Sequence, residues 1–192
     1  MDEPANPYAA PEIPPIVSVV ASPEDWEARQ LEAFVGAKAY YYLAKWAPVR
    51  RGWGGSAGFN WAAFLLSGLW LPYRKMYKVT FIFFGIIILE SILEDVLFLG
   101  ILGQAETPLA LDNAIGLLAA AICGAFGNRW YLSHARRVVS QVSATGLQGD
   151  ALLYTLAQRG GTSLLASVGM FVLFIVAISL IYVPLEMFLY EY

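Results

Sequence analysis

The sequence is poor in the residues from which catalytic and metal centres are usually built. Its 192 residues include one cysteine, Cys123, and one histidine, His134. A single cysteine excludes an intramolecular disulfide and a cysteine-based metal cage, and one histidine cannot form a protein-only metal site. The sequence also lacks a phosphate-binding loop, a GxSxG elbow, an HExxH helix and a dinucleotide fingerprint. We therefore expect a non-enzymatic protein without a metal or other cofactor.

Charged residues are scarce as well. They make up 14% of the chain, against about 25% in soluble domains, whereas hydrophobic residues reach 58%. The mean hydropathy is +0.57, which indicates a membrane protein. The net charge of −3 and the lack of a long basic run argue against a nucleic-acid partner. The first fifteen residues are acidic and proline-rich, so we expect no cleavable signal peptide and insertion through internal segments.

The first 78 residues predict a cytoplasmic region that does not cross the membrane. Residues 1–21 contain five prolines and are typical of a disordered tail. Ser22 is the predicted N-cap of an amphipathic helix that runs to about Trp46, and a glycine-rich loop completes the segment 22–58. In segment 59–78, the apolar run Trp61–Leu71 is about half of the ~20 residues that a ~30 Å hydrocarbon core requires. Basic residues flank this run on both sides, so we expect an interfacial or re-entrant helix.

Three later segments, residues 79–102, 109–126 and 163–184, predict transmembrane helices. The first contains the polar insertion ESILED, the second is rich in alanine and glycine, and the third has no charge between Leu164 and Val183. A short turn joins the first two, and a cytoplasmic helical segment, 127–161, precedes the third. Residues 185–192 form a short tail. The predicted fold is an all-α integral membrane protein with three transmembrane helices, an N-terminal amphipathic helix and one interfacial or re-entrant helix.

The basic residues predict an orientation. All twelve Lys and Arg lie within 29–78, within 129–137 or at Arg159, and the turn 103–108 and the tail contain none. Because basic residues in short loops remain on the cytoplasmic side, we expect a multi-pass protein of the bacterial inner membrane. Its N-terminus should be cytoplasmic and its C-terminus periplasmic.

Four phrases resemble an uncharacterised bacterial inner-membrane family that is defined only as a domain of unknown function. They are FVGAKAYYYLAKW at 34–46, FNWAAFLLSGLWLPYRKMY at 59–77, GNRWYLSHA at 127–135 and RGGTS at 159–163. The resemblance covers roughly residues 34–170. It implies a fold type with a few spanning helices and an inner-membrane location, and it implies no activity.

Three carboxylates in the first predicted span, Glu90, Glu94 and Asp95, are the most unusual feature. At 1.5 Å per residue, Glu90 lies ~18 Å beyond Lys78, at or past the bilayer centre. An ionised side chain at that depth costs ~2.5–3.5 kcal/mol, and the chain offers no cation on the outer side. Three interpretations remain open: the carboxylates reach water at the outer interface, they contact a partner subunit, or they line an ion or proton pathway.

Basic residues at the inner interface are candidates for binding anionic lipid headgroups. They are Arg74, Lys75, Lys78, Arg129, Arg136 and Arg137. Each cation near an anionic leaflet contributes ~1 kcal/mol. His134 lies among them and suits a headgroup or structural role, with an axial ligand to a haem or chlorophyll-type pigment as the alternative. We expect Cys123 to pack as a small hydrophobe, and Ala120, Gly124 and Gly127 to permit a close helix contact.

These features together favour a scaffold or accessory subunit of a larger inner-membrane complex. Respiratory and photosynthetic complexes are candidate hosts. Expected partners are other membrane-protein subunits and anionic lipid. The alternative is a small transporter or channel that uses Glu90 and Glu94.

Overall fold

The computed structural model describes residues 23–50, 52, 57–104 and 106–191, and every regular element in these ranges is helical. The elements are α1 (Pro23–Val35), the 3-10 turn η1 (Gly36–Lys38), α2 (Ala39–Arg50), α3 (Trp61–Leu66), the 3-10 turn η2 (Ser67–Leu69), α4 (Trp70–Tyr73), α5 (Tyr77–Asp95), the π-helical turn η3 (Val96–Ile101), α6 (Leu109–Ser143), α7 (Gly149–Arg159) and α8 (Leu164–Glu191). The predicted all-helical class is confirmed. The predicted tail 1–21, the N-cap Ser22 and most of the glycine-rich loop lie outside the described residues.

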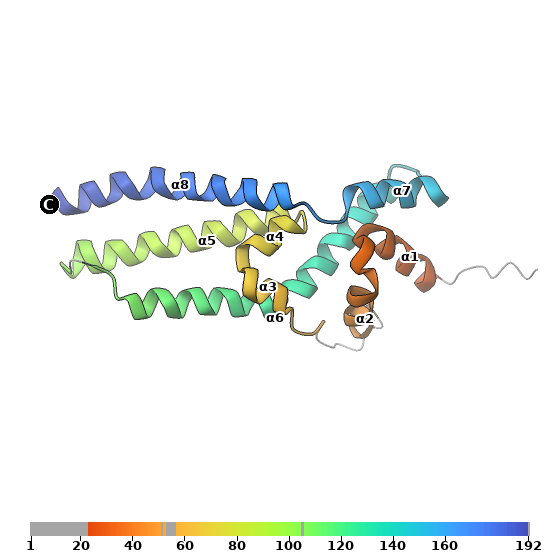
Figure 1. Cartoon of the computed structure of the whole chain (residues 1–192), viewed down its shortest axis with the longest axis horizontal. Coiled ribbons are helices and arrows are strands. Elements are labelled where there is room, and N and C mark those ends of the chain that lie inside the picture. Colours follow the sequence, from red (N-terminus) through yellow and green to blue (C-terminus); the bar gives the residue numbers. More distant parts are fainter. Residues whose placement is uncertain (1–22, 51, 53–56, 105, 192) are drawn as a thin grey trace, which may run out of the picture.

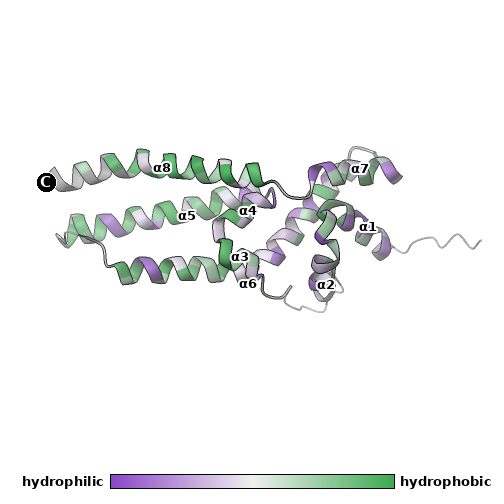
Figure 2. Cartoon of the chain, in the orientation of Figure 1, coloured by the Kyte–Doolittle hydropathy of each residue, from purple (hydrophilic) through white to green (hydrophobic). Residues whose placement is uncertain are grey.

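The molecule has two ends with different surfaces. At the three-helix end, α5, the first part of α6 and α8 extend in the same direction (Figure 1). At the other end, α1, α2 and α7 pack around the second part of α6, and we call this group the α1–α2–α7 module. The helices α3 and α4 lie between the two ends. Hydrophilic residues gather in the module, whereas the three-helix end is mostly hydrophobic (Figure 2).

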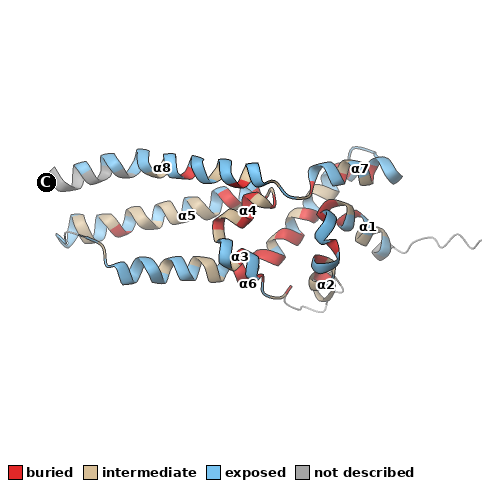
Figure 3. Ribbon diagram, viewed as in Figure 1, coloured by how far each residue is buried: buried red, intermediate tan, exposed pale blue. Residues whose placement is uncertain are grey.

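Large hydrophobic side chains cover the outside of the three-helix end. Ile86, Leu118 and Leu180, on its three helices, are each about 60–70% exposed. Figure 3 places most of the exposed surface there and most buried positions in α3, α4 and the module. The core is therefore built around Trp46, Trp70 and Tyr131, which are almost completely buried.

Two helices of the described chain are long and apolar enough to cross a membrane. One is α6, with 35 residues, and the other lies in the helical stretch Gly149–Ile181, whose apolar part belongs to α8. The helix α5 is not among them and carries the carboxylates of the ESILED insertion. The ring of Phe84 in α5 stacks on Phe174 of α8 with 3.9 Å between ring centroids.

The predicted amphipathic helix from Ser22 to Trp46 is not continuous. Gly36 has a φ of 73°, in the region that favours glycine, and this residue separates α1 from α2. The bend lets both helices contact α6. Phe34 from α1 and Trp46 from α2 each lie about 5–6 Å from Tyr131, measured between ring centroids.

The end of the second predicted transmembrane helix also differs from the prediction. The predicted second span ends near Phe126, but α6 continues without a break to Ser143. The basic aromatic stretch after Phe126 contains no proline and no glycine beyond Gly127, so nothing in the backbone ends the helix there. The same helix therefore belongs to both ends of the molecule.

Candidate functional site

The segment 73–77, YRKMY, forms a tight turn between α4 and α5. The backbone N–H of Met76 donates to the carbonyl of Leu71 at 3.0 Å, and that of Lys75 donates to Pro72 at 2.9 Å. Lys75 has a φ of 58°. This is the hydrogen-bond pattern of a Schellman helix end, in which glycine usually takes the position of Lys75. The two neighbouring cations have different surroundings: Arg74 is 5% exposed, and Lys75 reaches α7.

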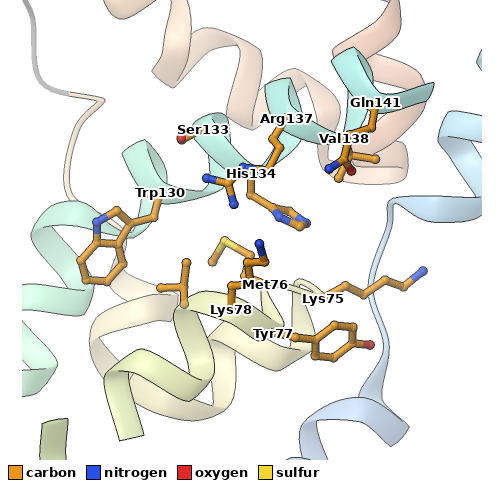
Figure 4. A pocket seen from close by; sticks show the side chains of 11 residues that line it. Lys75, Met76, Tyr77, Lys78, Trp130, Ser133, His134, Arg137, Val138 and Gln141 are labelled. Atoms are coloured by element: carbon orange, nitrogen blue, oxygen red, sulfur yellow. The ribbon is translucent and has the colours of Figure 1, made fainter. Parts of the chain in front are cut away.

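A basic pocket of about 320 Å³ lies between this turn and the middle of α6 (Figure 4). Lys78 approaches it from the start of α5, and His134 and Arg137 approach it from α6. Trp130 and Tyr77 are among its other lining residues. The pocket brings together cations from two of the three basic segments of the sequence, and its chemistry suits an anionic group.

Lys75 lines the same pocket, but its ammonium group has another partner. Its Nζ donates to the carbonyl of Gly160 at 2.5 Å and to that of Gln158 at 3.4 Å. These carbonyls belong to the C-terminal end of α7, where the helix dipole favours a positive charge. Lys75 therefore joins the α4–α5 turn to the end of α7.

Two other predicted lipid contacts, Arg136 and Arg74, have hydrogen-bond partners within the chain. The Nε of Arg136 donates to Glu27 Oε1 at 2.9 Å, and the Nε of Arg50 donates to Glu27 Oε2 at 3.1 Å. Burial alone raises the pKa of Glu27, but the hydrogen bonds and charges of Arg136 and Arg50 outweigh it and lower the pKa below its usual value. Arg74 is buried. Arg129 is exposed on α6, outside the pocket lining. The six predicted cations do not form one surface.

An acidic groove of about 510 Å³ lies at the three-helix end, between α5 and α6. Glu90 and Glu94 are its polar lining residues. The other walls are apolar: Ile86, Leu89, Leu93, Leu97, Phe98, Leu111 and Ile115. The π-helical turn η3 begins at Val96, directly after the acidic segment, and such turns are frequent at functional sites.

Glu94 is the buried carboxylate of this groove. It is 8% exposed, and its Oε1 accepts no hydrogen bond from the described residues. Its side chain shares a hydrogen bond with Asp112, and the charges of Asp112, Glu90 and Asp95 also act on it. The described chain contains no group of three or more His, Cys, Asp or Glu side chains placed to hold a metal ion. Glu94 thus presents an unsatisfied oxygen beside an apolar surface.

The small residues of α6 are used inside the chain. An added Cβ on Gly124 would lie 2.4 Å from the ring of Phe59, and one on Gly127 would lie 2.9 Å from Ala63. Both contacts are with residues of α3 or just before it, so the close helix contact that the stripe predicts is made by α3. Cys123, which precedes Gly124 in α6, is fully buried.

The sequence analysis missed a buried polar network around Asn128. Its side-chain nitrogen donates to the carbonyls of Ala57 and Gly58, both at 3.0 Å. Its backbone carbonyl accepts from Trp46 Nε1 at 2.9 Å, and its side-chain oxygen accepts from Asn60. The sequence signal that could have predicted this network is the asparagine in each of two aromatic phrases, FNW and GNRW. The network holds α2 and α3 on α6.

Comparison with known proteins identifies the chain by family alone. No curated protein and no solved structure matches it. A family model matches residues 28–137, a stretch that contains the first three phrases quoted above and excludes RGGTS. The match covers more than half of the sequence, and the chain belongs to the family described as "Protein of unknown function (DUF2628)".

Proposed function

We propose that this protein is a non-enzymatic accessory or scaffold subunit of a larger membrane complex, and that a transmembrane helix of a partner docks in the acidic groove. The observation that carries the proposal is the environment of Glu94. A carboxylate that is 8% exposed, with one oxygen unsatisfied, borders a groove with otherwise apolar walls. A partner helix with an apolar face and one basic side chain would complement both parts of this surface.

The proposal includes three membrane crossings, with α5 as the third. The two long apolar helices support it, as does the hydrophobic outside of the three-helix end. A soluble monomer rarely exposes so large an apolar surface. The α-helical part of α5 has 19 residues, or ~28 Å at 1.5 Å per residue. We place the module and N-terminus in the bacterial cytoplasm, because the described basic residues lie outside the distal part of the three-helix end.

The energetics favour a basic partner over isolated carboxylates. Ionised groups inside a membrane are costly and usually pair with one another or with polar groups that face the bundle interior. Glu94 has only carboxylates as charged neighbours, and repulsion among them adds to the cost. A lysine, arginine or histidine from a second subunit would reduce both the cost of the buried charge and the repulsion among the carboxylates. Closure of the groove would also bury Leu93 and Leu97, which are 60% and 44% exposed.

Site-specific photocrosslinking in native membranes tests this docking. A photoreactive residue replaces Leu93 in the groove, and in a matched control it replaces Leu165, which is 83% exposed on α8. We expect Leu93 to crosslink to a membrane segment that carries a basic residue, and Leu165 to give no such product. Glu94→Gln should reduce the crosslink at least several-fold, whereas Glu106→Gln, in the exposed turn before α6, should not.

Two results would contradict the proposal. One is crosslinking at Leu93 to lipid or to a second copy of the chain only. The other is a crosslinked segment without a basic residue. Ion flux in liposomes that contain this protein alone, lost in Glu94→Gln, would instead support the transporter alternative.

A further inference from the structure

The guanidinium of Arg74 is buried among tyrosines. Its Cζ lies 4.7 Å from the ring centroid of Tyr42, 5.1 Å from that of Tyr131 and 5.7 Å from that of Tyr73. Its Nη2 donates to the Tyr42 hydroxyl at 3.0 Å. Burial raises the pKa of Tyr42 although the Arg74 charge opposes the shift, so this hydroxyl stays neutral near pH 7. The tyrosine rings attract the cation, but Tyr42 does not neutralise it.

The charge of Arg74 has no anion beside it in the described chain. Glu27, the acceptor of both ion pairs found there, binds Arg50 and Arg136. The Nε and Nη1 atoms of Arg74 have no acceptor with good hydrogen-bond geometry. The buried Tyr131 hydroxyl interacts with the guanidinium, but this hydroxyl is neutral and supplies no negative charge. Arginine does not deprotonate in proteins, so burial leaves a permanent charge with unused donors. Such a group is strongly unfavourable unless a negative group compensates it.

A cavity of about 550 Å³ adjoins Arg74. It lies where η1 and α2 face α3 and α4, and Lys38, Arg74 and Thr162 contribute polar groups to its walls. Trp61 and Leu66 also line it and are 67% and 50% exposed. The volume is in the range of small-molecule sites. The cavity thus combines a buried cation, a second cation and an apolar rim.

We propose that this cavity binds the acidic head group of a membrane lipid. An oxyanion pairs with Arg74, Lys38 provides the second positive charge, and the hydrocarbon chain leaves over Trp61 and Leu66. The planar guanidinium is suited to phosphate and carboxylate oxygens because its donors match their geometry. The anion site follows from the burial of Arg74. The identification of the anion as a lipid head group rests on the membrane placement proposed above.

The basic pocket of Figure 4 is a weaker candidate for the same role. Lys78 and Arg137 are exposed there. Water screens exposed charges and weakens their ion pairs. A lipid in the Arg74 cavity would supply a counterion to a buried cation that has none in the described chain. A lipid in the basic pocket would only displace water from exposed cations. We therefore assign the specific site to the cavity.

Native mass spectrometry of the full chain tests the site. The protein is placed in nanodiscs of phosphatidylcholine that contain about one phosphatidylglycerol in ten lipids. In a second arm it is kept in neutral detergent with inorganic phosphate alone. We expect one phosphatidylglycerol to remain bound per chain, with roughly tenfold weaker retention in Arg74→Gln and a smaller loss in Arg74→Lys. Arg129→Gln, which removes an exposed cation of α6, is the control and should retain the lipid.

A second variant keeps the test independent of folding defects in Arg74→Gln. Leu66→Trp should fill the cavity from its half-exposed rim without changing the buried cation, and it should also lose the lipid. Retention of the lipid by both variants would overturn the proposal. Binding of inorganic phosphate that depends on Arg74, without any preference for phosphatidylglycerol, would overturn the lipid as ligand and leave a free anion in its place. Neither result depends on crosslinking at the acidic groove, so the two proposals fail separately.

Discussion

The side-chain nitrogen of Asn60 donates to the side-chain oxygen of Asn128 at 2.9 Å, and both residues are at most 1% exposed. The oxygen of Asn60 also accepts from the backbone N–H of Ala63 at 3.0 Å and caps α3. One pair of amides therefore fixes the start of a six-residue helix and attaches it to α6. Such a short helix is not stable alone, so its position depends on this contact.

Asn128→Ala should destabilise the protein by about 2–4 kcal/mol. The change leaves the Asn60 donor and the carbonyl of Ala57 without their partner, and each buried unsatisfied group costs ~1–3 kcal/mol. Thermal or chemical unfolding in detergent measures the loss. Asn113→Ala, at an exposed position of the same helix, should change stability little. Equal losses in the two variants would exclude a special role for the buried amide.

Gly124→Ala and Gly116→Ala should have opposite effects although both lie in α6. A Cβ at Gly124 meets the Phe59 ring at 2.4 Å and Phe64 Cβ at 3.0 Å, so α3 must move and stability should fall by about 1–3 kcal/mol. At Gly116 no atom lies within 4 Å, and alanine should raise stability by up to ~1 kcal/mol. Unfolding midpoints of the pair give the comparison. A tolerated Gly124→Ala would mean that α3 does not pack so closely.

Gly160→Ala should be the most damaging glycine substitution. The new Cβ would lie 1.8 Å from the backbone oxygen of Phe34, which a side-chain movement cannot relieve. We expect a loss of about 3 kcal/mol or more and faster amide hydrogen exchange in α7, which packs on α1 at this point. Gly169→Ala, with no atom within 4 Å in α8, is the matched control. Unchanged exchange in α7 would contradict this contact.

Stability should decrease in acid through Glu27. Its pKa is lower in the folded chain than in the unfolded chain, so its contribution is complete above the unfolded pKa and is lost as the pH falls through the folded value. The loss should therefore appear below the ordinary glutamate pKa of 4.5. Glu27→Gln should be less stable than wild type at pH 7, and the difference should shrink toward pH 3. A difference that stays constant with pH would rule out the ion pairs as its origin.

The sequence predicted those features that depend on local composition. The eleven apolar residues Trp61–Leu71 are too short to span a bilayer, and the structure folds them into α3, η2 and part of α4. The all-helical class was likewise predictable from apolar runs and helix signals. The small stripe at Gly124 indicated a close contact, although its partner is α3 of the same chain.

Other features depend on contacts that no local pattern encodes. Arg74 and Lys75 are neighbours of like charge, and only the left-handed backbone at Lys75, formed without a glycine, gives them different surroundings. The burial of Arg74 also requires Tyr42 and Tyr131, from two distant segments. The sequence analysis predicted one continuous helix through Gly36, and the bend there depends on the packing of α1 and α2 on α6.

The dependence of α3 on α6 has a consequence for biosynthesis. Asn60 is made 68 residues before Asn128, and α5 is synthesised in the interval. A nascent chain must therefore carry α3 past the synthesis of α5 with its final packing surface on α6 still missing. Truncation after residue 126 should leave α3 accessible to proteases and chaperones, and extension through residue 135 should protect it. Assembly of this protein would then proceed from its middle helix outward, not in the order of translation.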